Sequence, residues 1–188
     1  GSTWTPVDIT TQSQQNAGSG VTVPAAQGSP SAVVFNSVLS VFYRDANNEL
    51  SCIYLNGSQW IYYSPYNDAK ASTAVNGDPF AYAYLDQLHV LYPGDAYMQA
   101  CDVFAINGTW YFQILNTLTN PSGSQQGQGT VRGCQFSNSN HQQAHNVYWD
   151  ENNHVADFFY VGQWGYQDLN SLPQGITVPD AAGNPVPI

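Results

Sequence analysis

The stretches LNGSQW (Leu55–Trp60) and INGTW (Ile106–Trp110) share one pattern: a hydrophobic residue, Asn-Gly, a small hydroxyl residue and then Trp. Each stretch is flanked by runs rich in Val, Ile, Tyr and Phe, which favour β-strands. Asn-Gly between two such runs favours a type I′ hairpin, whose two central residues need positive φ. We therefore predict the same hairpin turn in two repeated units.

A third unit extends this repeat towards the C-terminus. Trp60, Trp110 and Trp164 recur about every 50 residues, and each follows a series of short hydrophobic runs. In the first unit the runs of strand type are Ala32–Phe35, Leu39–Arg44, Leu50–Leu55 and Trp60–Ser64. Four strands in each period of about 50 residues, with a Trp in the last, indicate the blades of a β-propeller.

We predict an all-β chain with a single β-propeller domain over residues 1–188, made of about three four-stranded blades. Helix is expected only as a short turn around Pro65–Ala74. The chain is expected to begin with one blade's last strand and to stop after another blade's first strand. The expected blades, followed by the terminal strand fragments, are 28–75, 77–120, 129–172, 1–27 and 173–188.

Three blades are too few to close a propeller ring. Unclosed sheet edges pair readily with other chains, because they present unpaired backbone groups. The chain is therefore expected to close its ring as a homo-oligomer, with its terminal fragments exchanged. The alternative is that it is an excerpt of a longer repeat protein.

Charge and composition restrict the classes of partner. The chain has thirteen acidic side chains but only three basic ones, which gives a formal net charge of −10. Such a surface is unsuited to nucleic acid and anionic membranes, and no stretch reaches the roughly 20 apolar residues of a membrane helix. Neutral polar residues with 14% aromatic residues suit uncharged polyhydroxyl ligands, as well as secreted β-proteins in general. We expect a secreted protein without a cofactor.

Cysteine and histidine give no sign of a metal centre. Cys52 and Cys101 hold equivalent places in neighbouring units, which would usually lie beyond the ~7 Å Cα separation that a disulfide bridges. We expect both to be small buried residues. His141 and His145 would share a face only on a helix, whereas their segment is predicted as loop and strand. We expect them, and His154, to be solvated polar residues.

The phrases G-[SD]-P, LSVFYRDANNEL, HNVYWDENNHV, G-x-W and D-[LI]-[TN] recur along the units. This pattern resembles the fucose-specific β-propeller lectins of fungi and related small bacterial lectins, over nearly the whole chain. The resemblance implies four-stranded blades with sugar bound between adjacent blades. Some bacterial members assemble one ring from several short chains, which fits the incomplete blade count.

The resemblance also implies which residues bind the sugar: an Arg on the second strand, an acid on the third and an aromatic residue near the fourth. The Arg position falls on Ser40, His89 and Asn146, so none of the units has the arginine. The acid position falls on Cys52, Asp102 (or its neighbour Cys101) and Asp157. The aromatic position falls on Trp60, Trp110 and Trp164.

Two units keep an acid and a Trp and are therefore the better candidate sugar pockets. The first candidate set is His89, Asp102 and Trp110, and the second is Asn146, Asp157 and Trp164, with Trp60 as a further aromatic candidate. Sugar hydroxyls need directional partners, because an unpaired buried polar group costs about 1–3 kcal/mol. The C–H face of a sugar needs an aromatic surface, which Trp provides. The alternative is that each Trp only packs the blades together.

We predict a non-enzymatic lectin that binds neutral glycans, fucosylated ones among them, at repeated inter-blade sites. The main alternative is a structural or protein-interaction propeller whose ancestral sugar site has decayed. A glycan-processing enzyme would need Asp102 and Asp157 in one pocket, about 5–9.5 Å apart, and no motif sets that separation. Asp45 and Asp150 are expected to begin hairpin turns and so to be structural.

Overall fold

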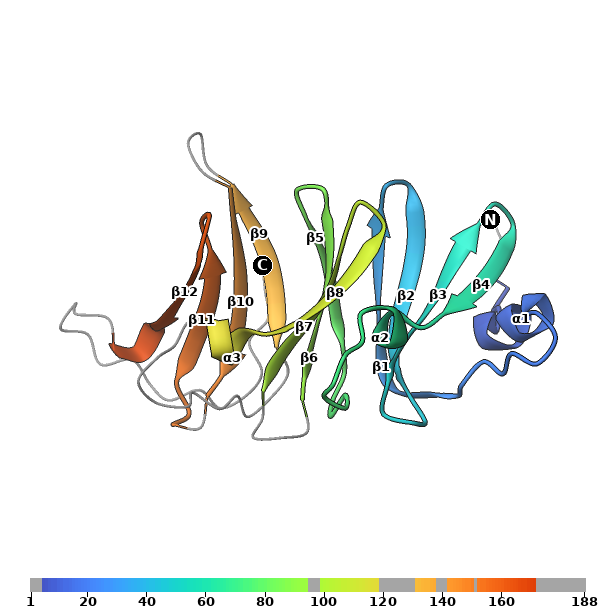
Figure 1. Cartoon of the computed structure of the whole chain (residues 1–188), viewed down its shortest axis with the longest axis horizontal. Helices are drawn as coiled ribbons and strands as arrows, with labels where there is room; N and C mark the ends of the chain where they lie inside the picture. Colours follow the sequence, from blue (N-terminus) through green and yellow to red (C-terminus); the bar gives the residue numbers. More distant parts are fainter. Residues whose placement is uncertain (1–4, 95–98, 119–130, 138–141, 151, 172–188) are drawn as a thin grey trace.

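A computed structural model of the chain describes residues 5–94, 99–118, 131–137, 142–150 and 152–171. The described strands form three antiparallel four-stranded sheets, which stand side by side in chain order in Figure 1. Blade A consists of β1 (Ala26–Phe35), β2 (Val38–Asp45), β3 (Leu50–Asn56) and β4 (Gln59–Tyr63). Blade B consists of β5 (Phe80–Tyr84), β6 (Gln87–Pro93), β7 (Ala100–Ile106) and β8 (Thr109–Ile114). Blade C consists of β9 (Arg132–Ser137), β10 (Gln142–Trp149), β11 (Val155–Tyr160) and β12 (Trp164–Asp168). The prediction of three four-stranded blades is confirmed.

The two Asn-Gly stretches are both hairpin turns, but of different types. In blade B, Asn107 and Gly108 are the central residues, and both have positive φ (51° and 78°), as a type I′ turn requires. In blade A, Asn56 still pairs with Gln59, so the central residues are Gly57 and Ser58. Only Gly57 has positive φ there, which is the pattern of a type II′ turn. The predicted type I′ geometry therefore holds in blade B alone.

The hydrophobic core lies between the blades. Successive side chains of a strand point to opposite faces, so β6 directs Val90 and Tyr92 towards blade A and Leu91 towards blade C. Across the A/B contact, the rings of Phe42 and Trp110 meet edge to face with centroids 6.1 Å apart. Blade B is thus buried on both faces, and its position is set by packing against two neighbours.

The cysteines are packing residues. The structure describes all three, and none forms a disulfide. Cys52 and Cys101 are both 0% exposed within the core between blades A and B, as predicted. Cys134 lies on β9 and is half-buried.

The sequence pattern does not predict α1 (Ile9–Asn16), which covers part of the outer face of blade A (Figure 1). The Asp8 side chain caps this helix by accepting a hydrogen bond from the Thr11 backbone N–H at 3.0 Å. The Asn16 amide donates to the Trp60 backbone oxygen at 3.0 Å. A blade's last strand was expected near the start of the chain, and that expectation is wrong for residues 5–16; residues 1–4 and 173–188 lie outside the described part.

Three short helical segments follow the last strands of the blades. α2 (Pro65–Asp68) lies in the stretch where a helical turn was predicted, and Pro at its first position suits a helix start. α3 (Leu115–Leu118) and the 3-10 turn η1 (Leu169–Ser171) follow blades B and C.

Asp45 and Asp150 begin the turns between the second and third strands, as predicted. Asp45 Oδ1 accepts from the backbone N–H groups of Asn47 and Glu49 at 2.8 and 3.0 Å. Asp150 Oδ1 accepts the equivalent bonds from Asn152 and His154, both at 2.9 Å. Each carboxylate therefore stabilises its own hairpin turn through local hydrogen bonds.

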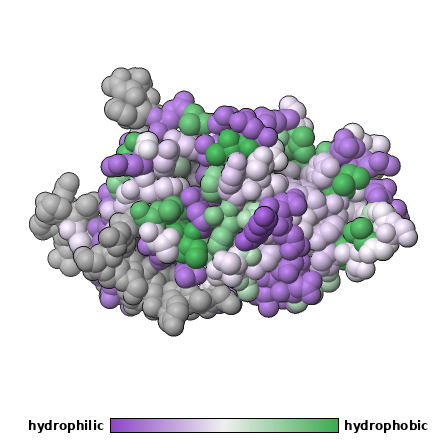
Figure 2. Space-filling view, in the orientation of Figure 1, coloured by the Kyte–Doolittle hydropathy of each residue, from purple (hydrophilic) through white to green (hydrophobic). Residues whose placement is uncertain are grey.

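The surface is mainly polar. Figure 2 shows hydrophilic and intermediate residues over most of the visible face, with hydrophobic residues in separate small areas. No helix within the described ranges is long and apolar enough to cross a membrane.

Gly133 on β9 tests how closely blades B and C pack. A methyl group at this position would overlap the ring of Tyr82, which is 7% exposed and held by blade C. We expect Gly133→Ala to destabilise the fold by about 1–3 kcal/mol, as overpacking does, and to lower the melting temperature by several degrees. Gly18→Ala is the matched control, because open space surrounds Gly18. Equal melting temperatures for both variants would contradict this packing.

Candidate functional site

Four polar side chains cluster on the face of blade B that meets blade C. We call Gln87, His89, Asp102 and Gln113 the blade B quartet. His89 Nδ1 lies 2.9 Å from Asp102 Oδ2, and Gln113 Nε2 donates to the same oxygen at 2.8 Å. His89 Nε2 lies 3.1 Å from Gln87 Oε1. Because a carboxylate accepts hydrogen bonds, Asp102 holds a proton on Nδ1 and fixes the orientation of the imidazole.

Aromatic rings hold His89 from both sides. Tyr82 and Phe104, its cross-strand neighbours, stack on the imidazole with centroid distances of 5.2 and 5.4 Å. His89 is 3% exposed and Asp102 is 0% exposed. The quartet is therefore a rigid wall whose geometry is set before any ligand arrives.

Blade C repeats this cluster. We call Gln143, His145, Asp157 and Gln167 the blade C quartet; they hold the same ladder positions as the blade B quartet. His145 Nδ1 lies 2.6 Å from Asp157 Oδ2, and Gln167 Nε2 donates to that oxygen at 2.9 Å. His145 Nε2 lies 3.0 Å from Gln143 Oε1. This quartet faces away from blade B, on the outer face of blade C, where all its members except Asp157 are half-buried.

Blade A carries uncharged residues at the same four ladder positions: Val38, Ser40, Cys52 and Tyr63. Burial raises the pKa of the Cys52 thiol to about 12, although hydrogen bonds with Tyr63 and Ser40 favour the thiolate. The thiol is therefore neutral at pH 7, where the other two blades carry a carboxylate.

Three members of the blade B quartet line a pocket between blades B and C, which we call the B/C pocket. Its volume is about 170 Å³. Gln87, His89 and Gln113 form the polar wall on blade B. Tyr160 and Trp164 form the facing wall on blade C, with their ring centroids 5.4 Å apart. The pocket thus combines hydrogen-bonding groups with an aromatic surface.

A second pocket, the A/B pocket, occupies the corresponding place between blades A and B. Its volume is about 570 Å³. Ser40 and Tyr63 of blade A line it from the positions that His89 and Gln113 hold in blade B. Trp110 of blade B lines the facing wall. The larger of the two pockets therefore lacks the quartet.

Residues that the sequence assigns to one site lie in different places in the structure. Trp110 pairs with Ala105, three residues after Asp102, so Trp110 and Asp102 lie on opposite faces of blade B. The expected set of His89, Asp102 and Trp110 is therefore wrong as a single pocket. Instead Trp164 of blade C faces His89 across the B/C pocket.

Three further predicted ligands lie outside both pockets. Asn146 is 0% exposed in the contact between blades B and C, where its Oδ1 accepts from the Tyr82 hydroxyl at 2.8 Å. Trp60 packs against the cluster that contains Tyr43 and Ile53, beside α1. Asp157 belongs to the open quartet of blade C, not to the B/C pocket that Trp164 lines.

Sequence reasoning missed the four glutamines and His145. The signal was present as Q-x-H in QLH (Gln87–His89) and QAH (Gln143–His145). The alignment was shifted by one residue and matched Asn146, in place of His145, with His89. The expectation that His145 is a solvated loop residue is therefore wrong: it lies on β10 and contacts Asp157. His141 lies outside the described residues.

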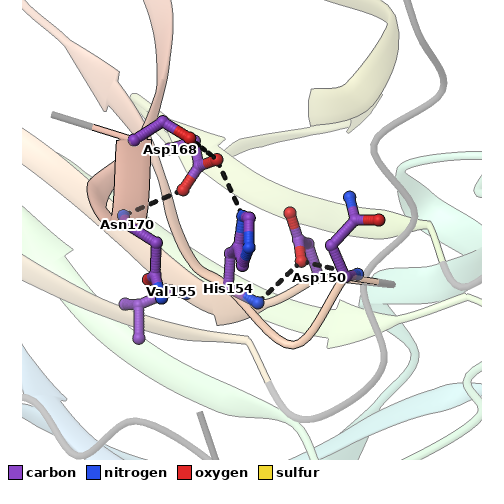
Figure 3. Close-up of polar contacts among 7 residues, drawn as sticks. Asp150, His154, Val155, Asp168 and Asn170 are labelled. Atoms are coloured by element: carbon purple, nitrogen blue, oxygen red, sulfur yellow. Dashed lines mark hydrogen bonds and ion pairs between the residues drawn. The ribbon is translucent and has the colours of Figure 1, made fainter. Parts of the chain in front are cut away.

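A third histidine–carboxylate pair fixes the end of blade C. Figure 3 shows His154 between Asp150 and Asp168, with Nδ1 2.8 Å from Asp168 Oδ2. Asp168 Oδ1 accepts from the Asn170 backbone N–H at 2.9 Å, and Asn170 Oδ1 accepts from that of Val155 at 2.9 Å. His154 is thus a bonded structural residue. Among the residues that the structure describes, no three His, Cys, Asp or Glu side chains are grouped to hold a metal ion.

No protein-family model matches this sequence, and no curated protein does either. Among solved structures, the chain is similar to a fucose lectin from Kordia zhangzhouensis in complex with methyl-fucoside. The TM-score is 0.54 and the identity 12%, over 74% of this chain and 97% of that chain. AofleA from Arthrobotrys oligospora is also similar, as a triple arginine-to-alanine mutant, with TM-score 0.56 and 14% identity over 83% of this chain and 43% of that chain. These similarities confirm the β-propeller fold predicted from the blade repeat.

The Asp168 cluster makes a pH-dependent contribution to stability. Partial burial raises the pKa of Asp168, but hydrogen bonds from Ser171, His154 and Asn170 outweigh it and lower the pKa below 3.8. A lowered folded-state pKa stabilises the fold above the unfolded value and loses that effect as pH falls through the folded value.

We therefore expect Asp168→Asn to lower the melting temperature at pH 7 by roughly 2–4 °C, and the difference from the unaltered chain to vanish near ~pH 2. Thermal unfolding followed by circular dichroism at both pH values measures this. The exposed Asp86 provides the control substitution, Asp86→Asn. A difference that persists unchanged in acid would contradict the assigned role.

Proposed function

We propose that this chain is a non-enzymatic carbohydrate-binding protein of the lectin type, which binds neutral glycans in the B/C pocket. The observation that carries the proposal is the facing pair of walls: the amides and imidazole of blade B opposite the Trp164 indole of blade C. Sugars need both directional hydrogen bonds to their hydroxyls and an aromatic surface for their C–H groups.

The quartet leaves hydrogen-bonding capacity for a ligand. Gln87 uses Oε1 and Gln113 uses Nε2 within the quartet. Gln113 Oε1 can therefore accept from a sugar hydroxyl, and the Gln87 amide keeps one of its two polar groups for a ligand, since the other contacts His89 Nε2. Both glutamines of this wall thus keep a polar group for a hydroxyl of the ligand.

The size and charge of the site favour a small neutral sugar. The volume of about 170 Å³ lies below the ~300–1,000 Å³ of drug-sized ligand pockets, and suits a single sugar ring. None of the three basic residues of the chain lines the pocket, so it offers no cationic partner for an anionic glycan.

The comparison with the fucose lectin from Kordia zhangzhouensis supports a carbohydrate ligand through the shared fold. At the position where the resemblance implies an arginine, this chain has His89. We therefore propose neutral glycans in general, fucosylated ones among them. The alternative of a glycan-processing enzyme is disfavoured, because Asp102 and Asp157 lie in separate quartets, each paired with its own histidine.

A glycan array probed with the labelled full chain tests the proposal, with free L-fucose as one competitor. Binding that L-fucose blocks would support fucosylated ligands, and binding to other neutral glycans would support the lectin with another sugar. A blank array with folded protein would overturn the proposal and favour the interaction propeller.

Trp164→Ala should weaken the affinity for the glycan that binds best on the array about tenfold or more, because a lost aromatic contact costs on the order of 1.4 kcal/mol. Isothermal titration calorimetry measures the change. The control is Tyr111→Ala, since Tyr111 is a 46% exposed aromatic residue of β8 that lines neither pocket. If the two variants bind equally well, the aromatic wall is not part of the site.

We also propose that a second copy of the chain covers the outer face of blade C. In support, this face carries a half-buried quartet whose blade B counterpart is covered by the next blade. The outer face of blade A carries Trp60, the counterpart of Trp164, beside the part that α1 covers. A head-to-tail contact between these faces would complete a further polar and aromatic pocket.

Light scattering after size exclusion measures this association, and we expect a mass at least twice that of one chain. Val147→Lys places a charge on the outer face of blade C and should yield single chains. Val161→Lys is the control, because Val161 is 41% exposed in the turn between β11 and β12. A single-chain mass for the unaltered protein would overturn the association.

We also propose that the protein is secreted. A polar acidic surface and a glycan ligand fit an extracellular protein. Detection of the native protein in the extracellular fraction would support it.

A further inference from the structure

The A/B pocket has the position of the B/C pocket but a different chemistry. We propose that it binds an uncharged ligand carrying an aromatic ring, a ligand class distinct from the glycans proposed for the B/C pocket. This inference rests on the lining of the A/B pocket, and it stands whether or not the B/C pocket binds sugar.

Aromatic side chains form much of the pocket wall. Phe35, Tyr54 and Tyr63 come from blade A, and Trp110 comes from blade B. The Tyr63 ring lies 5.5 Å from that of Tyr54 at 77°, and 5.9 Å from that of Trp110 at 41°. Aromatic rings prefer such tilted and edge-to-face contacts, so a ligand ring entering this wall meets partners already oriented for it.

The remaining lining places its amides and carboxylate at the hairpin turns, where Asn36, Asp86 and Asn107 are exposed. Val38, Leu88 and Ala105 add apolar surface. The hydroxyls of Ser40 and Tyr63 lie close to the thiol of Cys52, the neutral residue at the position of Asp102. A sugar hydroxyl buried against Ser40, Leu88 and Ala105 lacks the imidazole and glutamine amides that line the B/C pocket, and each unpaired group costs about 1–3 kcal/mol.

The charged groups around the pocket favour neither an anion nor a cation. Asp86 is the only Asp, Glu, Lys, Arg or His side chain among the described lining residues. It is exposed at the turn between β5 and β6, where water and salt screen its charge. The apolar and aromatic contacts therefore dominate, and they favour an uncharged ligand.

The volume fits a molecule of two or three rings. The pocket measures about 570 Å³, within the ~300–1,000 Å³ of small-molecule sites and over three times the B/C pocket. Replacing the long polar glutamine and histidine side chains by Val38 and Ser40 leaves this extra room.

The test uses the full chain and N-phenyl-1-naphthylamine, an uncharged aromatic probe whose fluorescence rises in apolar surroundings. We expect saturable binding that Val38→Glu weakens at least tenfold, because the variant puts a carboxylate into the pocket wall. Val34→Glu is the matched control: Val34 is 64% exposed on the neighbouring strand β1 and does not line the pocket. If Val38→Glu does not fold, Val38→Gln replaces it and should weaken binding in the same direction.

Competition then separates the ligand classes. Displacement of the probe by uncharged phenols or phenyl ethers, and not by methyl fucoside or choline, would support the proposal. Probe binding that both glutamate variants weaken equally would overturn it, as would the absence of saturable binding. Displacement by methyl fucoside would make the pocket a sugar site, and displacement by choline a cation site; either result would also overturn it.

Discussion

The structure depends on the burial of both faces of its four-stranded sheets. A strand points alternate side chains to opposite faces, so each blade needs a neighbour on either side to cover its apolar residues. Blade B has two such neighbours, and Val90, Tyr92 and Leu91 are each 0% exposed. Blades A and C have one neighbour each, and α1 partly takes the place of the second for blade A. Among the residues that the structure describes, no second neighbour covers the outer face of blade C.

This packing also creates the pockets. Each one joins the second, third and fourth strands of one blade to the fourth-strand Trp of the next, so its two walls belong to different units. A substitution on one face of blade B therefore changes one pocket without changing the other. Gln87, His89 and Gln113 give the B/C pocket amide and imidazole groups, whereas Val38, Ser40 and Tyr63 hold the equivalent positions in the larger A/B pocket. Two pockets at equivalent places in the repeat thus have different chemical linings.

The sequence predicts the blades well, because the Asn-Gly turns and the recurring Trp are local signals. It predicts the site less well, because residues of one unit were grouped together although opposite faces separate Asp102 from Trp110. Two residues on paired strands share a face only if their ladder positions are an even number of residues apart. That number is known only once the register of the strands is known. For the same reason, an alignment shifted by one residue matched Asn146 with His89 and left His145 unrecognised. The helix α1 was missed because ITTQSQQN has no apolar stripe; its signal was the cap at Asp8.

The measurement that tests the central claim most directly is a crystal structure of the full chain with its best array ligand. We expect a sugar in the B/C pocket, with hydroxyls bonded to Gln87 or Gln113 and its C–H face on Trp164. A glycan bound elsewhere on the chain, with the B/C pocket free of sugar, would contradict the claim that the quartet and the facing Trp form the binding site.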